Sequence, residues 1–218
     1  MSSLRTRLRA LPSIVGSSAP FDPLGSPDTP RELFVDWLEQ AIERGVPEPQ
    51  AATLSTVDLS GIPDARVLVL KDVTEDGAFE IATGMESAKG AQLRANPACA
   101  LSFYWSSLAR AVRIRGVAER ATTEESARDF AARHPDAKAI TLVGRQSRTY
   151  ADRDEHDRLL ADAHARLAVD QDLVSPDWAV WRVAPLTVEF WQGESTRDHT
   201  RLQYVRVADT WEKRRLWS

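Results

Sequence analysis

The chain has 218 residues, with 28 lysines and arginines against 32 aspartates and glutamates, so its formal net charge is −4. Charges of both signs are interleaved throughout, which argues against the strongly basic face of a general nucleic-acid binder. No apolar run is long enough for a membrane span or for the core of a signal peptide. Because Cys99 is the single cysteine, the sequence excludes a disulfide framework and a cysteine metal site, and we expect a compact cytoplasmic protein with Cys99 buried in a strand.

The first 28 residues contain four prolines and show no sustained hydrophobic period. They predict a flexible arm, or one that becomes ordered only against a partner subunit. A helix is expected to begin at Pro30, because Thr29 and Glu32 have the spacing of a capping box and proline is favoured at the first helical position. Its apolar residues recur along one face, and Gly45 is expected to end it.

From residue 51 the pattern changes to short apolar runs separated by turn residues, which predicts a meander of antiparallel hairpins. Helices are expected at 87–95, after Thr122, which has the capping-box spacing with Glu125, and at 152–168. About nine strands with inserted helices predict an α+β fold built on an antiparallel barrel. The strands are expected at 51–57, 65–72, 78–83, 98–105, 110–120, 178–184, 187–192, 202–208 and 211–217.

Two groups of residues in the first half have the chemistry of an anion site. Arg66 and Lys71 stand at the two ends of one apolar strand, where period two places them on opposite faces unless a bulge intervenes. Thr83, Ser87 and Lys89 span a strand end, a turn and a helix start, and backbone amides at such a point suit a phosphate. Solvated strand ends and an ordinary helix cap are the competing interpretations.

Two further groups lie in the second half. The polar loop 144–148 could present amide and hydroxyl groups to a ring or a phosphate, or serve only as a connector. The segment with Trp191, Arg197, His199 and Arg201 combines a stacking face with forked donors, which suits a planar anionic ligand, although a turn with surface arginines would look alike. No nucleophile-elbow motif is present, so the sequence offers no apparatus for hydrolysis.

A histidine metal site is not expected. The remaining histidines lie on segments that read as exposed helices, away from one another in the pattern. They are His134, His156 and His164.

Taken in order and spacing, these four groups resemble the pyridoxamine 5'-phosphate oxidase family of FMN-dependent split-barrel enzymes. The resemblance runs from about residue 30 to Ser218 and is strongest in RVLVLK (66–71), SAKG (87–90), RQS (145–147) and VEFWQG with RxHxR (188–201). It implies an antiparallel split barrel with inserted helices, FMN as the cofactor, and a homodimer that contacts each flavin from both subunits. The expected division is an arm at 1–28, the FMN-binding split barrel at 29–175, and an oxidase-type extension at 176–218.

The resemblance also implies which residues touch FMN. Residues at the positions of Arg66, Lys89, Gln146 and Ser147 hold the phosphate, the ribityl chain or the ring edge, while Trp191 and Arg201 approach the flavin from the C-terminal segment. Three positions depart from the family pattern: Ala82 replaces a tyrosine, Ala88 an arginine and Ala111 a glutamine. The loss of these side chains should lower the affinity for FMN without preventing its binding. The full set of expected cofactor contacts is Arg66, Val67, Lys71, Thr83, Ser87, Lys89, Gln146, Ser147, Trp191 and Arg201.

For the substrate, the resemblance implies that Lys71 and Arg133 grip a phosphate, while Arg197 and His199 cover the ring and act in catalysis. The usual tyrosine and serine phosphate contacts are here Asp129 and Ala137; the carboxylate repels a phosphate and the alanine lacks a donor.

Three functions follow from the resemblance. The first is oxidation of pyridoxamine or pyridoxine 5'-phosphate to pyridoxal 5'-phosphate with O₂ as acceptor. The second is oxidation of a non-phosphorylated aromatic metabolite, as in the similar phenazine-biosynthesis oxidases. The third is flavin binding without oxidase turnover, with a deazaflavin as a related possibility.

Overall fold

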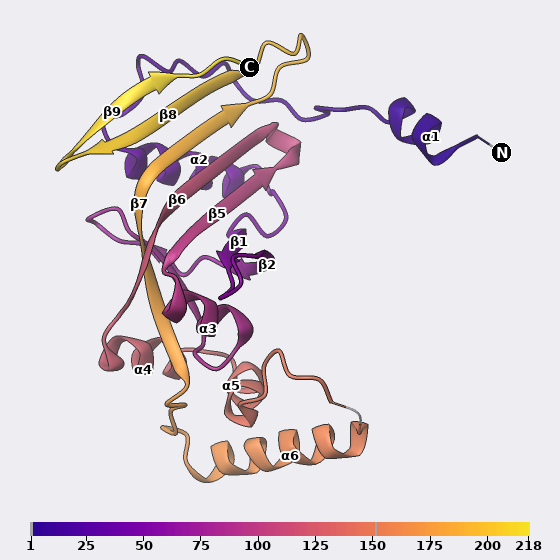
Figure 1. Ribbon diagram of the computed structural model, residues 1–218, viewed down its shortest axis with the longest axis vertical. Coiled ribbons are helices and arrows are strands. Elements are labelled where there is room, and N and C mark those ends of the chain that lie inside the picture. Colours follow the sequence, from indigo (N-terminus) through magenta and orange to yellow (C-terminus); the bar gives the residue numbers. More distant parts are fainter. Residues whose placement is uncertain (1, 151) are drawn as a thin grey trace. The chain divides into compact units, whose positions relative to one another are not determined.

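The computed structural model describes residues 2–150 and 152–218 (Figure 1). The chain forms two compact units. We call residues 1–51, 102–114 and 186–218 the terminal unit, and residues 52–101 and 115–185 the central unit.

Runs of strands and runs of helices follow one another along the described chain, which confirms the predicted α+β class. The helices are α1 (Leu4–Ala10), α2 (Pro30–Glu43), α3 (Ala88–Ala95), the 3-10 turn η1 (Ser106–Leu108), α4 (Thr123–Ala131), α5 (Pro135–Val143) and α6 (Arg153–Val169). The strands are β1 (Ala51–Val57), β2 (Pro63–Val69), β3 (Asp72–Val73), β4 (Phe79–Gly84), β5 (Ala98–Trp105), β6 (Arg110–Arg120), β7 (Trp178–Gln192), β8 (Thr200–Val207) and β9 (Thr210–Arg215).

Within the described residues the strands belong to one hydrogen-bonded sheet, in the order β2-β1-β5-β6-β7-β4-β3. Strand β8 pairs with β7, and β9 pairs with β8. The pairs β3–β4, β4–β7, β7–β8 and β8–β9 are antiparallel. Strands that neighbour each other in the sheet but not in the chain, such as β4 and β7, bring distant segments together.

The core of the terminal unit is built on aromatic rings. Helix α2 starts as predicted, with Thr29 accepting a hydrogen bond from the Glu32 amide and Pro30 in the first turn. Its buried face carries Phe34 and Trp37, whose rings meet Phe103 and Phe190 edge-on at centroid distances of 5.0 Å and 5.2 Å. Such edge-to-face pairs add to the free energy of apolar burial.

The segment before α2 differs in part from the sequence prediction. Residues Leu4–Ala10 form α1, which has no buried residue. Further along, the Gln192 amide donates to the Ala19 carbonyl oxygen at 3.1 Å, and the Tyr204 hydroxyl donates to that of Pro27 at 2.7 Å. This stretch therefore has specific contacts within its own unit, while the boundaries at residues 28 and 175 stay predictions.

The predicted strand at 65–72 is two strands. Strand β2 ends at Val69, the Lys71 amide donates to the Glu80 carbonyl oxygen at 2.8 Å, and β3 begins at Asp72. The physical reason is a change of partner, because β2 lies next to β1 in the sheet while β3 pairs with β4. Lys71 thus sits at a break, where strict alternation of side chains does not apply.

The two strands predicted at 178–184 and 187–192 are one strand, β7. Pro185 falls between two stretches of β7 that have different partners. Residues 178–183 pair with β4, and residues 187–192 pair with β8. Neither register includes Pro185, so its missing amide hydrogen is not needed for the pairing with β4 or with β8.

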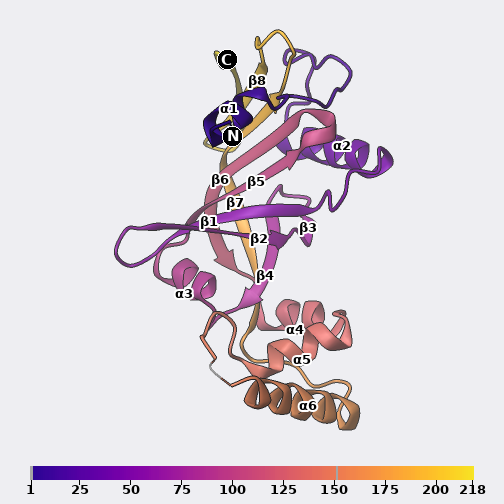
Figure 2. The same cartoon turned by 90° about the vertical axis from the view of Figure 1, so that its right-hand side faces the viewer.

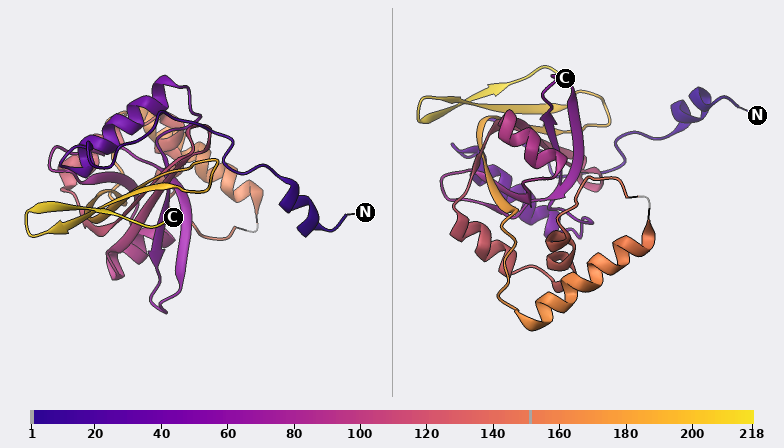
Figure 3. Two further views of the ribbon diagram at one scale, coloured as in Figure 1. Left: turned by 90° about the horizontal axis from the view of Figure 1, so that it is seen from above. Right: turned by 60° about the horizontal axis from the view of Figure 1, so that its bottom comes forward.

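Three helices follow β6 in the central unit (Figure 2). The sequence patterns did not predict α5, which is short, although Pro135 in its first turn and Gly144 at its end with φ of +66° are ordinary start and stop signals. Helices α5 and α6 lie side by side (Figures 2 and 3), and Ala163 is the buried residue of α6. Cys99 is buried in β5 as expected, and burial raises the pKa of its thiol to about 11.

Helix α4 has the capping box that the sequence predicts. The Thr122 hydroxyl accepts from the Glu125 amide at 3.2 Å, and the Glu125 carboxylate accepts from the Thr122 amide at 2.9 Å. We expect Thr122→Ala to lower the free energy of unfolding by about 1 kcal/mol, since one amide of the first turn loses its acceptor. Urea denaturation measures this change. Thr122→Ser keeps the hydroxyl and should stay within about 0.5 kcal/mol of the wild type, and an equal loss in both variants would contradict the capping role.

Candidate functional site

The central unit contains a cavity of about 550 Å³. Strand β2 contributes Val67 and Val69, β4 contributes Thr83, α3 contributes Lys89, and α5 contributes Ile140. The wall is therefore mostly apolar with a few polar groups, which is the usual character of a small-molecule site.

Two groups that are far apart in the sequence meet at the junction of β4 and α3. Ser87 caps α3 by accepting from the Gly90 amide at 3.2 Å, and its hydroxyl lies 3.2 Å from that of Thr83. From the 144–148 loop, the Gln146 Oε1 accepts from the Thr83 hydroxyl at 3.4 Å, and the Ser147 hydroxyl accepts from the Ala88 amide at 3.3 Å. The second and third groups of the sequence analysis thus form one polar corner.

Gly90 lets helix α3 start close to the end of β4. A Cβ atom at this position would collide with the Gly84 carbonyl oxygen and with backbone atoms of Met85. The close approach keeps the first turn of α3, with its free amides and its positive dipole end, beside the Thr83 hydroxyl.

Arg66 and Lys89 concentrate positive charge in the central unit. The Arg66 guanidinium is held by the Thr56 hydroxyl at 2.6 Å and Gln92 Oε1 at 2.8 Å, and it pairs with Asp64. Lys89 is half-buried and has no ion pair within the described residues. Burial, and secondarily the charge of Arg66, lower the pKa of Lys89 below its ordinary value. A bound anion would relieve this unfavourable environment.

Lys71 and Arg133, the residues expected to hold a substrate phosphate, also line this cavity. The Lys71 ammonium lies 2.9 Å from Asp129 Oδ1, and Asp129 Oδ2 accepts from the Trp178 indole N–H at 2.7 Å. The Lys71 and Asp129 side chains are 31% and 19% exposed, so this ion pair is partly shielded from water. The sequence marked Asp129 as a departure but carried no sign of its two partners.

Arg133 is positioned by the same indole. Its guanidinium carbon lies 3.7 Å from the centroid of the Trp178 ring, and its Nη2 donates to the Ala137 carbonyl oxygen at 3.0 Å and to the Thr141 hydroxyl at 3.3 Å. Its Nε is buried and lacks a hydrogen-bond partner within the described residues. Burial lowers the pKa of Arg133, and the charge of Asp129 opposes that shift. Arg133 therefore keeps an unused donor.

The fourth group lies in the terminal unit. The rings of Trp191 and His199 have centroids 5.0 Å apart, and His199 Nδ1 accepts from the Glu194 amide at 3.1 Å. Arg197 has φ of +71°, a rare conformation for a residue with a side chain, and its Nη2 donates to the Ser13 hydroxyl at 2.5 Å.

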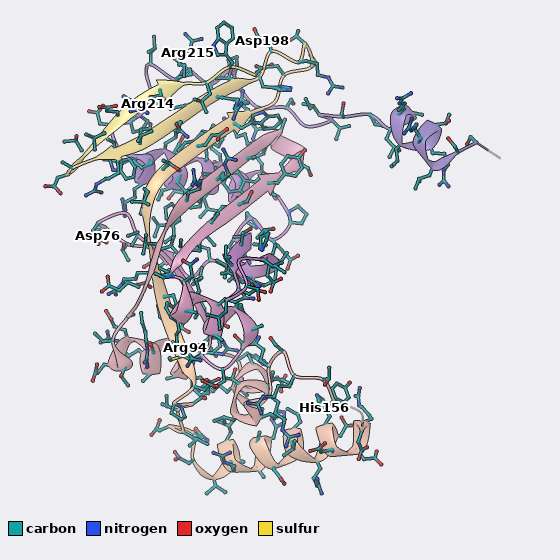
Figure 4. The ribbon with its side chains drawn as sticks, viewed as in Figure 1. Asp76, Arg94, His156, Asp198, Arg214 and Arg215 are labelled. Atoms are coloured by element: carbon teal, nitrogen blue, oxygen red, sulfur yellow. The ribbon has the colours of Figure 1, made fainter. Side chains whose placement is uncertain are left out.

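Arg201, which the resemblance places toward the flavin, is held by a buried carboxylate. Its Nε and Nη2 donate to Glu189 Oε1 at 2.9 Å and 2.6 Å, and Arg113 also pairs with this buried carboxylate. Glu189 is a residue that the sequence analysis missed, because nothing in its strand pattern shows that it faces two arginines. Figure 4 labels Arg214 and Arg215 on β9 and Asp198 on the loop before β8.

Residues 2–150 and 152–218 contain no helix that is long and apolar enough to cross a membrane. They also contain no group of three or more histidine, cysteine, aspartate or glutamate side chains that could hold a metal ion.

Comparison with known proteins defines the family. Residues 38–151 match a family model described as pyridoxamine 5'-phosphate oxidase, and residues 178–218 match one described as pyridoxine 5'-phosphate oxidase C-terminal dimerisation region. The chain is 41% identical over 193 residues to a pyridoxine/pyridoxamine 5'-phosphate oxidase of Pseudomonas paraeruginosa, covering 88% of this chain and 89% of the relative. A Caulobacter vibrioides protein of the same name is 37% identical over 195 residues, covering 89% and 87%.

Solved structures give the same fold. PhzG from Burkholderia lata 383, in complex with tetrahydrophenazine-1-carboxylic acid, superposes with a TM-score of 0.87 at 27% identity over 93% of this chain and all of that one. A pyridoxamine 5'-phosphate oxidase-related, FMN-binding protein from Nostoc punctiforme gives 0.72 at 16% identity, covering 88% and 100%, which bears on the fold alone. The fold and these matches define an FMN-dependent split-barrel oxidoreductase, as predicted. The chain belongs to the pyridoxamine 5'-phosphate oxidase family.

Proposed function

We propose that this protein oxidises pyridoxamine or pyridoxine 5'-phosphate to pyridoxal 5'-phosphate, with O₂ as the electron acceptor. The observation that carries the proposal is the single cavity wall on which Lys71 and Arg133 lie together with Lys89. Two separate cationic positions suit two anionic groups, one on the cofactor and one on the substrate. The names of the relatives support the same substrates.

The residues of the central unit fit the phosphate end of FMN. Positive charge and amide donors come from Lys89, which has no ion pair among the described residues, from Arg66 beside it, and from the capped start of α3. Thr83, Ser87, Gln146 and Ser147 add hydroxyl and amide groups in the same corner, and Val67 adds an apolar contact. FMN, when bound, accepts a hydride and is reoxidised by O₂. Ala82 lines this cavity and Ala88 stands at the start of α3, so the weaker FMN binding expected from these alanines stays a prediction.

The task of the chain itself is to bind and orient the substrate. Lys71 and Arg133 would hold its charged substituent, which fixes the direction in which the ring enters the cavity. The roles of Arg197 and His199 over the substrate ring, and of Trp191 and Arg201 toward the flavin, stay predictions from the resemblance. They are tested by single substitutions once turnover is measured.

We further propose a homodimer, because residues 178–218 match a region described as a dimerisation region. The cytoplasmic location stays a prediction from the sequence.

A second candidate is oxidation of an aromatic metabolite without a phosphate. The Lys71–Asp129 ion pair favours it, because the carboxylate offsets the charge that a phosphate would use. The high similarity to PhzG, whose structure contains a carboxylic acid ligand, points in the same direction.

Aerobic turnover decides between these functions. The FMN-loaded protein is mixed with each of the two phosphorylated substrates, and pyridoxal 5'-phosphate and hydrogen peroxide are measured together. We expect the two products to form in equal amounts, with a KM in the micromolar range, about the low end for enzymes. No turnover by a protein that still binds FMN would overturn the proposal. Turnover of a dihydro- or tetrahydrophenazine carboxylate instead would support the second candidate, and no turnover of any substrate would indicate a flavin-binding protein.

A further inference from the structure

A buried carboxylate in the terminal unit, Glu189, is paired with Arg201 on the neighbouring strand. We propose that Glu189 is a positioning residue, which fixes the Arg201 guanidinium beside Trp191 before FMN binds and so increases the affinity for the flavin. The inference rests on the part of the proposed function that brings Arg201 to the flavin, and it does not depend on which substrate is oxidised.

The register of β7 and β8 places the pair on one face of the sheet. Trp191 stands opposite Arg201, and Glu189 points to the same face as Trp191 because side chains alternate along a strand. Phe190 and Leu202, which are opposite each other in this register, are buried on the other face. The carboxylate is therefore directed toward the guanidinium and the indole, and away from the aromatic core.

Three nitrogens of Arg201 have partners. Its Nε and Nη2 donate to Glu189 Oε1 at 2.9 Å and 2.6 Å, and its Nη1 donates to the Trp217 carbonyl oxygen at 2.8 Å. The other carboxylate oxygen, Oε2, pairs with Arg113 of β6, the strand on the other side of β7. An arginine that is already fixed loses less conformational freedom when it meets a ligand.

The carboxylate is the enclosed member of this group. The Glu189 side chain is 8% exposed, whereas that of Arg201 is 27% exposed and that of Arg113 is 54% exposed. Loss of the carboxylate charge would therefore leave two arginines that water still reaches, and not a fully buried unpaired charge. For this reason we expect Glu189→Gln, which keeps the side-chain shape, to remain folded.

The sign of the effect on FMN separates positioning from simple charge. FMN is an anion, so a Glu189 that acted only through its negative charge would oppose FMN binding, and its neutralisation would strengthen that binding. A Glu189 that positions Arg201 has the opposite effect. Its neutralisation weakens FMN binding, because Arg201 must then become ordered during the binding step.

Titration of the apoprotein with FMN, followed by flavin fluorescence, measures this effect. We expect Glu189→Gln to increase the dissociation constant of FMN by about 3- to 10-fold, the usual cost of immobilising one long side chain on binding. The matched control is Glu212→Gln on β9, a half-exposed carboxylate that pairs with Arg214 and should leave the dissociation constant unchanged. Unchanged or tighter FMN binding by Glu189→Gln would overturn the inference.

A double-mutant cycle separates positioning from damage to the fold. Arg201→Gln alone should weaken FMN binding by about tenfold or more, since a charged donor is lost. In the Arg201→Gln protein, adding Glu189→Gln should change the dissociation constant by less than about twofold, because the residue through which Glu189 acts is gone. Equal weakening by Glu189→Gln in both backgrounds would indicate a structural role and overturn the inference.

Arg113→Gln keeps the inference testable if the Arg201→Gln protein does not fold. This change removes the other arginine but leaves both bonds from Arg201 to Glu189 Oε1, so it should weaken FMN binding less than Glu189→Gln does. A loss as large as that of Glu189→Gln would mean that the positioning of Arg201 is not the cause.

The inference and the proposed function can fail separately. Absent turnover of both phosphorylated substrates, with FMN affinities that follow the double-mutant cycle, would overturn the substrate and support the role of Glu189. Normal turnover with unchanged FMN affinity in Glu189→Gln would overturn the role of Glu189 alone. Wild-type FMN affinity in Arg201→Gln would overturn that role together with the predicted contact between Arg201 and the flavin.

Discussion

Lys89→Met should lower the affinity for FMN by about 100-fold, so that the protein is purified largely without its yellow colour. Lys89 is half-buried beside Arg66 and has no ion pair in the described chain, so its charge is free for the cofactor phosphate. A hydrogen bond to a charged group contributes about 1.5–3 kcal/mol, and methionine keeps most of the aliphatic length while removing it. Quenching of flavin fluorescence on titration of the apoprotein measures the dissociation constant.

The control is Lys138→Met, a lysine of α5 in the same unit that does not line the cavity. It should bind FMN as the wild type does. If Lys89→Met retained wild-type affinity, the polar corner between β4 and α3 would not be the phosphate site, whatever the enzyme's substrate.

Phe103→Ala should lower the free energy of unfolding by about 3–5 kcal/mol, the usual cost of emptying a large aromatic site in a core. Phe103 is 0% exposed, and its ring packs against Phe34 at 5.0 Å and Trp105 at 6.0 Å. The rings around it come from helix α2 and strand β5, which cannot close fully over the lost volume. Urea denaturation followed by tryptophan fluorescence gives the change.

The neighbouring substitution Tyr104→Ala provides the comparison, because Tyr104 is 61% exposed on the opposite face of the same strand. Its effect on unfolding of the chain should be about 1 kcal/mol or less. A similar decrease in the free energy of unfolding in both variants would mean that strand propensity, and not core packing, determines the stability of β5.

The predicted elements that proved accurate are those with local signals. The caps at Thr29 and Thr122 require only residues within one turn of helix, and both are present in the structure. The single strand at 65–72 was wrong because its division depends on which strands pair with it, and the separate strands at 178–184 and 187–192 were wrong because β7 continues through Pro185 while its partner changes from β4 to β8. Strand pairing is non-local, so neither could be derived from a window of sequence.

The same distinction applies to the candidate site. Thr83, Ser87 and Lys89 follow one another at a strand-to-helix junction and could be identified directly. That Gln146 would join them, and that Asp129 would neutralise Lys71, depends on the placement of helices α4 and α5. The family resemblance assigned roles to these positions, but it contained no information on the ion pair that this chain forms.

The proximity of Arg66 and Lys89 has a consequence for how the protein is maintained in a cell. Burial, and secondarily the neighbouring charge of Arg66, lower the pKa of Lys89, so keeping its ammonium form makes the folded chain without FMN less stable than its packing alone would give. A ligand that binds only the folded state at 100 times its dissociation constant adds about 2.7 kcal/mol to the free energy of unfolding. Flavin supply would then set the lifetime of the polypeptide as well as its activity, since chains that remain without FMN unfold more often and are degraded sooner.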